Sequence, residues 1–303
     1  MRGVLREEWQ WLIRRRRIGI LLAGTVLVML LVAQGTGQVA SVASLDSALI
    51  ASIPLLNAQI GRLFATSLCL ALQGWLMLLA PLVAVSVVAP QSAILDPARL
   101  IARLLALWGV MLLALVLTLP FFSLLPLFGS LSLPEVGWAF AVIVATMLLS
   151  GAYSLCWTTV VRNPPAALFL SYSVLLIWLV AVVLIATTNP TPSVLAVLAI
   201  AFNPFAALLS PLAPAFPPDG PIATDLQNLL RFTHGAIAKE TPLYRLYVAG
   251  SGLLILAFVA IASFAMRPLP RRWQRFDTLL LSVLLIYLAG LLFWREWWSA
   301  ALP

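Results

Sequence analysis

Few side chains in this 303-residue sequence could take part in chemistry, and most of them lie inside apolar stretches. Ser150, Ser154 and Thr158 recur at every fourth position, with Gly151 beside them, which places them on one face of a helix. Such a face has two interpretations: helix–helix packing through small polar residues, or the lining of a transport pathway. Other polar residues inside the apolar stretches include Gln73, Thr118, Thr146 and Thr159.

Catalytic motifs are missing from the sequence. The single histidine, His234, falls in a predicted loop, where a solvated residue is expected rather than a base or a ligand. No serine-hydrolase, zinc-protease or phosphate-loop motif occurs. Cys69 and Cys156 lie in apolar runs without metal-ligand spacing, and we expect no disulfide between them. We therefore predict no catalytic, cofactor-binding or metal site on this chain.

Composition indicates what surrounds these residues. Hydrophobic residues make up 63% of the chain and charged residues 9%, against about 45–50% and about 25% in an ordinary globular domain. Runs such as Leu104–Pro120 do not alternate as the strands of a membrane barrel must. The sequence predicts an all-α integral membrane protein, a polytopic helical bundle. The net charge of +8 then reflects arginines that set topology, and we expect no nucleic-acid partner.

The order of apolar stretches predicts six spans and three regions. Residues 1–17 have helical spacing of apolar residues and form a cytoplasmic amphipathic helix; an uncleaved first span is favoured over a signal peptide. A six-span region 18–266 follows, and then a basic turn with a C-terminal hydrophobic helix, 267–303. A seventh span at 278–294, ending in an external aromatic belt, is favoured over an interfacial helix. The six spans are predicted at 18–38, 63–89, 104–124, 136–161, 166–187 and 246–266.

The connections between these spans differ in character. Residues 39–61, 125–135 and 188–245 are predicted to be external, and in the last of them Pro204 breaks an apolar stretch. That break favours an interfacial or re-entrant piece over another crossing. The cytoplasmic connections contain helix starts, at Asp96-Pro97 and at Pro164-Pro165.

Basic residues support a cytoplasmic N-terminus. Thirteen of the 18 lie on the proposed cytoplasmic side, including Arg14–Arg17 and four arginines between residues 267 and 275. Arg99 and Arg103 are four residues apart, on one face of the helix that leads into the third span.

Taken in order, these segments resemble the permease subunits of the type-2 family of ABC transporters. The small-residue span that leads into GAYSLCWTTVVRNPPAALFLSYSVLLIWL, residues 151–179, carries the most specific likeness. The amphipathic N-terminal helix, the helical piece before span 3 and the broken stretch AFNPFAALLS add to it. The resemblance covers about residues 1–270 and implies a dimerising six-span exporter in a bacterial-type cytoplasmic membrane.

The resemblance also implies partners. A separate ATP-binding subunit would bind ATP and Mg²⁺, and a second permease copy or a homologous permease would complete the dimer within membrane lipid. In the family the N-terminal helix and the turn between spans 2 and 3 meet the ATPase. Here the coupling candidates in those segments are Arg6, Glu7, Glu8, Asp96, Arg99 and Arg103.

The sequence departs from the family in two places. The second turn is shortened to QSAILDPARLIAR, and the run after residue 277 exceeds the six-span plan. Two other classes of protein therefore stay open: a non-transporting membrane scaffold or assembly factor, and a membrane-embedded enzyme that acts on lipids. The apolar spans lean toward a lipid-like, drug-like or peptide cargo.

Overall fold

The computed structural model describes residues 16–46, 53–87, 97–123, 131–161, 163–188, 194–216, 224, 226–228, 242–267 and 273–300. Nearly all of these residues are helical, and this part of the chain contains no strand. The longer helices are α2 (Arg16–Asp46), α3 (Ile53–Val87), α4 (Pro97–Phe122), α5 (Leu133–Val161), α6 (Pro164–Thr188), α11 (Leu243–Ala265) and α12 (Arg275–Phe293). The shorter ones are α7 (Val194–Ala201), α8 (Pro204–Leu209), the 3₁₀ turn η2 (Ala213–Ala215) and α13 (Arg295–Ser299).

Six of these helices are long and apolar enough to cross a membrane, because about 20 apolar residues span a bilayer core. Helix α6 has 25 residues, of which the apolar stretch Pro164–Val180 has described side chains. The predicted all-α polytopic membrane bundle is therefore confirmed. The six stretches are Ile18–Gln38, Ala58–Ser86, Arg99–Phe122, Leu133–Val161, Leu243–Ala265 and Arg275–Phe293.

Two helix boundaries differ from those that the sequence predicts. Helix α2 continues to Asp46 and α3 begins at Ile53, so helix takes up much of the predicted external loop 39–61. No glycine or proline lies between Gln38 and Asp46 to end α2, and Pro54 sits in the first turn of α3, where proline is tolerated.

Helix α5 also begins earlier than predicted, at Leu133 instead of 136. The backbone N–H of Ser132 donates to Glu135 Oε2 at 2.7 Å, and the N–H of Glu135 approaches Ser132 Oγ at 3.5 Å. This reciprocal pair is a capping box, which satisfies donors that a helix start leaves open.

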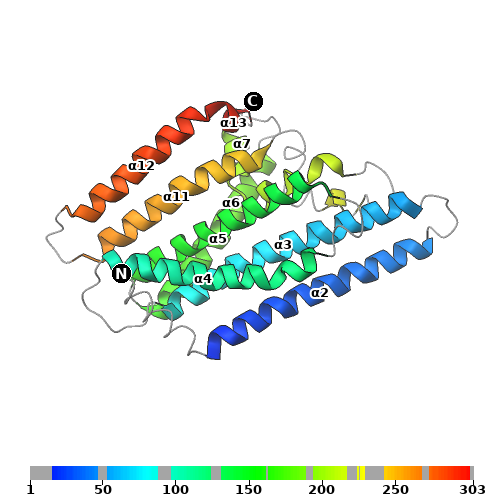
Figure 1. Cartoon of the computed structure of the whole chain (residues 1–303), viewed down its shortest axis with the longest axis horizontal. Coiled ribbons are helices and arrows are strands. Elements are labelled where there is room, and N and C mark those ends of the chain that lie inside the picture. Colours follow the sequence, from blue (N-terminus) through cyan, green and yellow to red (C-terminus); the bar gives the residue numbers. More distant parts are fainter. Residues whose placement is uncertain are drawn as a thin grey trace.

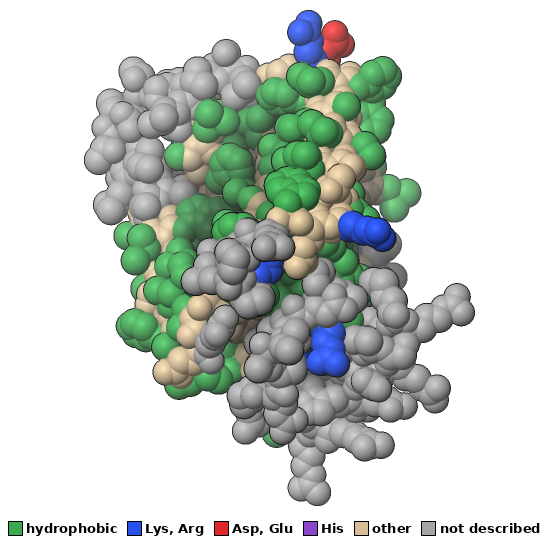
Figure 2. All heavy atoms as spheres, turned by 90° about the vertical axis from the view of Figure 1, so that its left-hand side faces the viewer, with side chains coloured by type: hydrophobic (Ala, Val, Ile, Leu, Met, Phe, Trp, Pro, Cys, Tyr) green, Lys and Arg blue, Asp and Glu red, His purple; other side chains and the backbone are tan. Residues whose placement is uncertain are grey.

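The long helices run side by side and alternate in direction (Figure 1). Helices α2, α4, α6 and α12 begin at one end of the bundle, and α3, α5 and α11 end there. This is the end at which the sequence places its cytoplasmic connections. In the view onto this end, the described side chains are mostly hydrophobic, with scattered basic ones among them (Figure 2).

Helix α5 occupies the centre of the bundle. It packs most extensively against α11 and α3, and it also contacts α4, α6 and α8. Helix α12 lies at the periphery beside α11, and none of its residues is buried. Its C-terminal extension α13 returns to the bundle, where Trp297 packs against Trp138 of α5 with ring centroids 5.5 Å apart.

The apolar stretch that Pro204 interrupts forms two short helices instead of a crossing, as predicted. Helix α7 has 8 residues and α8 has 6, far too few to span a bilayer. The side chain of Asn203 accepts a hydrogen bond from the N–H of Phe205 at 2.9 Å and so caps α8. Both helices pack inside the bundle, where α7 contacts α6 and α11, and α8 contacts α3, α5 and α11.

Several predicted features lie outside the described residues. They are the amphipathic helix with Arg6, Glu7 and Glu8, the cap residue Asp96, and the loop histidine His234. The helix starts at Pro97 and Pro164 are confirmed, since α4 and α6 begin there.

Candidate functional site

The predicted polar face of α5 is buried between helices. Ser150 and Thr158 are each 5% exposed, and Ser154 is fully buried. The hydroxyls of Ser150 and Thr158 donate to the carbonyls of Met147 and Leu155, one turn earlier in the helix. The hydroxyl of Ser154 has no hydrogen-bond partner. The hydroxyls of Ser150 and Thr158 therefore form hydrogen bonds within their own helix. The Ser154 hydroxyl is the one of the three that could still bond to another group.

Gly151, beside this face, makes room for α4. A Cβ atom at Gly151 would lie 2.8 Å from Nε1 of Trp108, closer than side chains tolerate. The Trp108 indole donates to the carbonyl of Leu148 at 3.1 Å. This close approach is the helix-packing role that small residues have in membrane bundles. The pathway role predicted for Ser150, Ser154 and Thr158 stays a prediction.

The least satisfied polar side chain in the described bundle is Gln73 of α3. It is fully buried, and neither its amide nitrogen nor its amide oxygen has a partner. The hydroxyls of Thr66 and Ser171 are likewise buried without a partner. Thr66 lies two turns before Gln73 on the same face of α3. Because a buried unsatisfied polar group costs about 1–3 kcal/mol, these positions indicate either a functional requirement or a second arrangement of the helices.

Sequence analysis did not single out Gln73 from the other polar residues of the spans. The available signal was its residue type and place, since Gln73 is the carboxamide that lies nearest the middle of a predicted span. Its burial depends on α5 and α8 packing over α3, which no local pattern in the sequence shows.

A satisfied polar contact lies between α5 and α11. Thr146 Oγ1 and the Tyr247 hydroxyl are 2.8 Å apart, and both residues are buried. Because the Thr146 hydroxyl already donates to the carbonyl of Val142, Tyr247 is the donor to Thr146. This bond fixes the relative position of the two central helices.

Helix α8 reaches the middle of the bundle. The ring of Phe205 lies in van der Waals contact with the position of Gly74, near the midpoint of the apolar stretch Ala58–Ser86. On the neighbouring side, the ring of Phe202 occupies space that a Cβ at Gly250 of α11 would need. The pair α7–α8 therefore enters the bundle to the depth of Gln73, which favours a re-entrant piece over an interfacial one.

The two coupling candidates on α4 differ in accessibility. Arg99, in the first turn, is exposed, whereas Arg103, one turn further into the bundle, is 7% exposed. A partner subunit at this end could therefore reach Arg99 directly, whereas Arg103 is enclosed by the bundle. The remaining candidates Arg6, Glu7, Glu8 and Asp96 lie outside the described residues.

No group of His, Cys, Asp or Glu residues suited to a metal ion occurs within the described ranges. Cys69 and Cys156 are both free and buried. Comparison with protein-family models, curated proteins and solved structures finds no match to this chain. The candidate site therefore rests on geometry alone: buried polar positions on α3, α5 and α6, next to a broken helix pair.

Proposed function

We propose that this multi-pass membrane protein is the permease subunit of an ABC exporter of type 2, driven by a separate ATP-binding subunit. The observation that carries the proposal is the broken pair α7–α8, which enters the bundle as far as Gly74. Non-helical backbone at membrane depth is tolerated where it is buried in protein or lines a cavity, and transporters use such breaks. A scaffold has no need of one.

The unsatisfied positions support transport for a second reason. Gln73 and Ser154 have no partner in this arrangement of the helices. In an alternating-access cycle, a second packing of the bundle, water or cargo would supply those partners. ATP binding to the partner subunits then selects one of two packings. The order of segments that resembles the family, from the helical piece at Pro97 to the broken stretch before α11, supports this particular class of transporter.

Coupling is tested at Arg99. Arg99→Glu reverses one exposed charge at the end where the ATPase would bind, whereas Arg295→Glu reverses an exposed charge at the opposite end. The permease is co-expressed with a candidate ABC ATPase from the same genome, and both co-purification and ATP-driven transport in proteoliposomes are measured.

We expect Arg99→Glu to reduce both readouts and Arg295→Glu to change neither. Equal behaviour of the two variants would contradict the coupling role of Arg99. Co-purification of a partner enzyme in place of an ATPase would favour the scaffold alternative.

A further inference from the structure

Polar side chains follow one face of α3 from the start of its apolar stretch toward the middle of the bundle. They are Gln59, Arg62, Thr66 and Gln73, and their intervals of three, four and seven residues keep them on one face of a helix. The eleven residues from Arg62 to Gln73 correspond to about 16 Å along the helix axis. That is half the thickness of a bilayer core of about 30 Å. We refer to these four residues as the α3 stripe.

The inner part of the α3 stripe is buried without hydrogen-bond partners. Thr66 and Gln73 are both 0% exposed, and neither the Thr66 hydroxyl nor the Gln73 amide has a partner among the described residues. A buried polar group without a partner costs free energy, and here that cost is repeated along one line. Next to Gln73, the ring of Phe205 in the first turn of α8 contacts the position of Gly74. The α3 stripe therefore leads to the broken pair α7–α8.

An ion pair lies at the outer end of the stripe, where α3 and α5 begin and where the sequence predicts the external side. Arg62 Nη1 lies 3.7 Å from Glu135 Oε1 of α5, and the two side chains are only 16% and 19% exposed. This distance is too long for a hydrogen bond, and Nη1 is buried without such a bond to any described residue. The other oxygen of Glu135 already accepts the N–H of Ser132 at 2.7 Å. The pair thus joins α3 to α5 loosely.

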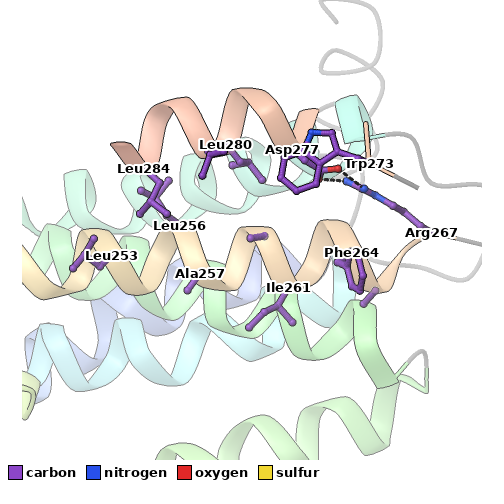
Figure 3. Close-up of a pocket in the computed structure, with 13 residues that line it drawn as sticks. Leu253, Leu256, Ala257, Ile261, Phe264, Arg267, Trp273, Asp277, Leu280 and Leu284 are labelled. Carbon is purple, nitrogen blue, oxygen red and sulfur yellow. Dashed lines mark hydrogen bonds and ion pairs between the residues drawn. The ribbon is translucent and has the colours of Figure 1, made fainter. Parts of the chain in front are cut away.

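The ion pair between α11 and α12 shows the tighter alternative. The Arg267 guanidinium donates to both carboxylate oxygens of Asp277 and, at 3.0 Å, to Ser263 Oγ. These residues lie at one end of an apolar cavity of about 640 Å³ between the two helices (Figure 3). Hydrogen bonds to both oxygens offset the cost of removing the two charges from water. No such bond joins Arg62 to Glu135 in the described structure, so that pair resists opening less.

We propose that the α3 stripe is the outer half of a polar pathway between α3 and α5, and that the Arg62–Glu135 ion pair is its gate. When the pair opens, water and the polar part of a cargo reach Thr66 and then Gln73, and they supply the hydrogen bonds that these side chains lack. When the pair closes, both side chains are sealed from water, as they are in this structure. The inference rests on the proposed transport function and adds a substrate class to it, a cargo with hydrogen-bonding groups.

Water access along the stripe is measured with single cysteines. The background replaces both native cysteines, Cys69→Ala and Cys156→Ala. Thr66→Cys on the stripe is compared with Leu68→Cys on the opposite face of α3, because Leu68 is equally buried and lies at nearly the same depth. The full chain is placed in nanodiscs of neutral lipid. Mass spectrometry measures the rate at which each cysteine reacts with an anionic, membrane-impermeant methanethiosulfonate.

The gate is tested by Glu135→Gln. Glutamine removes the charge, and its carbonyl oxygen can still accept the Ser132 N–H in the capping box, so α5 keeps its start. The matched control is Glu296→Gln, which removes an exposed carboxylate in the first turn of α13. Each substitution is combined with Thr66→Cys and with Leu68→Cys, and thermal unfolding of every variant is measured in parallel.

We expect Thr66→Cys to react at least about tenfold faster than Leu68→Cys, because the reactive thiolate forms in water and not in apolar surroundings. Glu135→Gln should raise the rate of Thr66→Cys about fivefold, the upper effect of an ion pair near a surface. It should leave the rate of Leu68→Cys unchanged. Glu296→Gln should change neither rate.

Equal rates for Thr66→Cys and Leu68→Cys would overturn the pathway. The gate would be overturned if Glu135→Gln left the rate of Thr66→Cys unchanged, or if it raised the rate of Leu68→Cys by the same factor, since the whole bundle would then have loosened.

A second pair of positions covers the case in which Thr66→Cys lowers the unfolding temperature. Gln73→Cys and Leu72→Cys, at fully buried positions deeper in α3, then replace the first pair and must show the same difference in rate. None of these measurements uses an ATPase or transport. A negative result therefore removes the pathway and its gate and leaves the ABC assignment to the experiment at Arg99.

Discussion

Helices α5 and α12 are both long and apolar, yet they lie in opposite environments. In the most apolar 18-residue stretch of α5, 72% of the residues are buried, against none in α12. The sequence of α12 is rich in leucine, whereas the buried part of α5 is rich in Gly, Ala, Ser and Thr. Lipid tails are as apolar as leucine, so apolar character does not draw a helix into a membrane bundle. Small residues, which allow close approach, decide which helix is central.

The attachments of α12 agree with this difference. The helix is held at its start by Arg267–Asp277, along its length by the Tyr287 hydroxyl, which donates to the carbonyl of Ala249 at 2.8 Å, and beyond its end by α13. Helix α5 is held by continuous packing on several sides. Substitutions that add or remove volume should therefore act strongly on α5 and weakly on α12.

The largest effect is expected from Gly151→Leu. A side chain at this position meets Trp108 and breaks its bond to the Leu148 carbonyl, and overpacking of this kind destabilises by about 3 kcal/mol. The matched control is Gly290→Leu in α12, where a Cβ would meet nothing within 4 Å. Thermal unfolding in mild detergent measures both. Similar midpoints for the two variants would contradict the contrast between the helices.

The second effect concerns the end of α13. Trp297 packs against Trp138 with the two rings tilted by 37°, and it lies 5.7 Å from the Arg245 guanidinium, whereas Trp294 is 66% exposed. Trp297→Ala should lower the free energy of unfolding by about 2 kcal/mol, because an aromatic pair and a cation–π contact are lost together. Trp294→Ala should leave it unchanged. An equal loss in both variants would show that both tryptophans act as lipid anchors and that neither is a packing contact.

Much of this arrangement could be predicted from the sequence, because helix ends and spans are local properties. The starts at Pro97 and Pro164 and the break at Pro204 follow from the chemistry of proline, and the spans follow from uncharged length. The capping box Ser132–Glu135 was also readable, since its spacing is a known helix start. Tertiary contacts could not be predicted from local patterns. Trp108 packs over Gly151, for example, although the two residues are 43 positions apart in the sequence.

In the candidate site, too, local features could be predicted from the sequence and tertiary contacts could not. Residue type and spacing located Ser150, Ser154 and Thr158 on one face of α5, but their different hydrogen bonding depends on the packed structure. Gln73 becomes distinctive only when its amide is seen to be buried without a partner. The two coupling candidates on α4 also differ in a way that the sequence does not show. Arg103 lies deeper in the bundle and is buried, whereas Arg99 is exposed.

A third prediction separates function from stability at Gln73. Gln73→Leu replaces an unsatisfied amide by an apolar group of similar size, which should raise the free energy of unfolding by about 1 kcal/mol. Under the proposed function, ATP-driven transport should fall at the same time, because the pathway loses a polar group. Gln34→Leu, at an exposed position of α2, is the control and should change neither quantity. A loss of stability in Gln73→Leu would instead give the amide a structural role.

The smallest expected effect concerns single hydrogen bonds. It tests whether the loss of one bond, like a change of side-chain volume, affects α5 more than α12. Tyr247→Phe removes the buried bond from the Tyr247 hydroxyl to Thr146 that joins α5 and α11, and such bonds inside membrane bundles contribute about 0.6 kcal/mol. Tyr287→Phe removes the bond to Ala249 that joins α12 to α11. We expect Tyr247→Phe to lower the free energy of unfolding measurably and Tyr287→Phe to lower it less. A double-mutant cycle of Tyr247→Phe with Thr146→Val should give a coupling energy of similar size to the first loss. If Tyr287→Phe costs as much, polar contacts hold the peripheral helix as firmly as the central one, and the difference between α5 and α12 is one of packing alone.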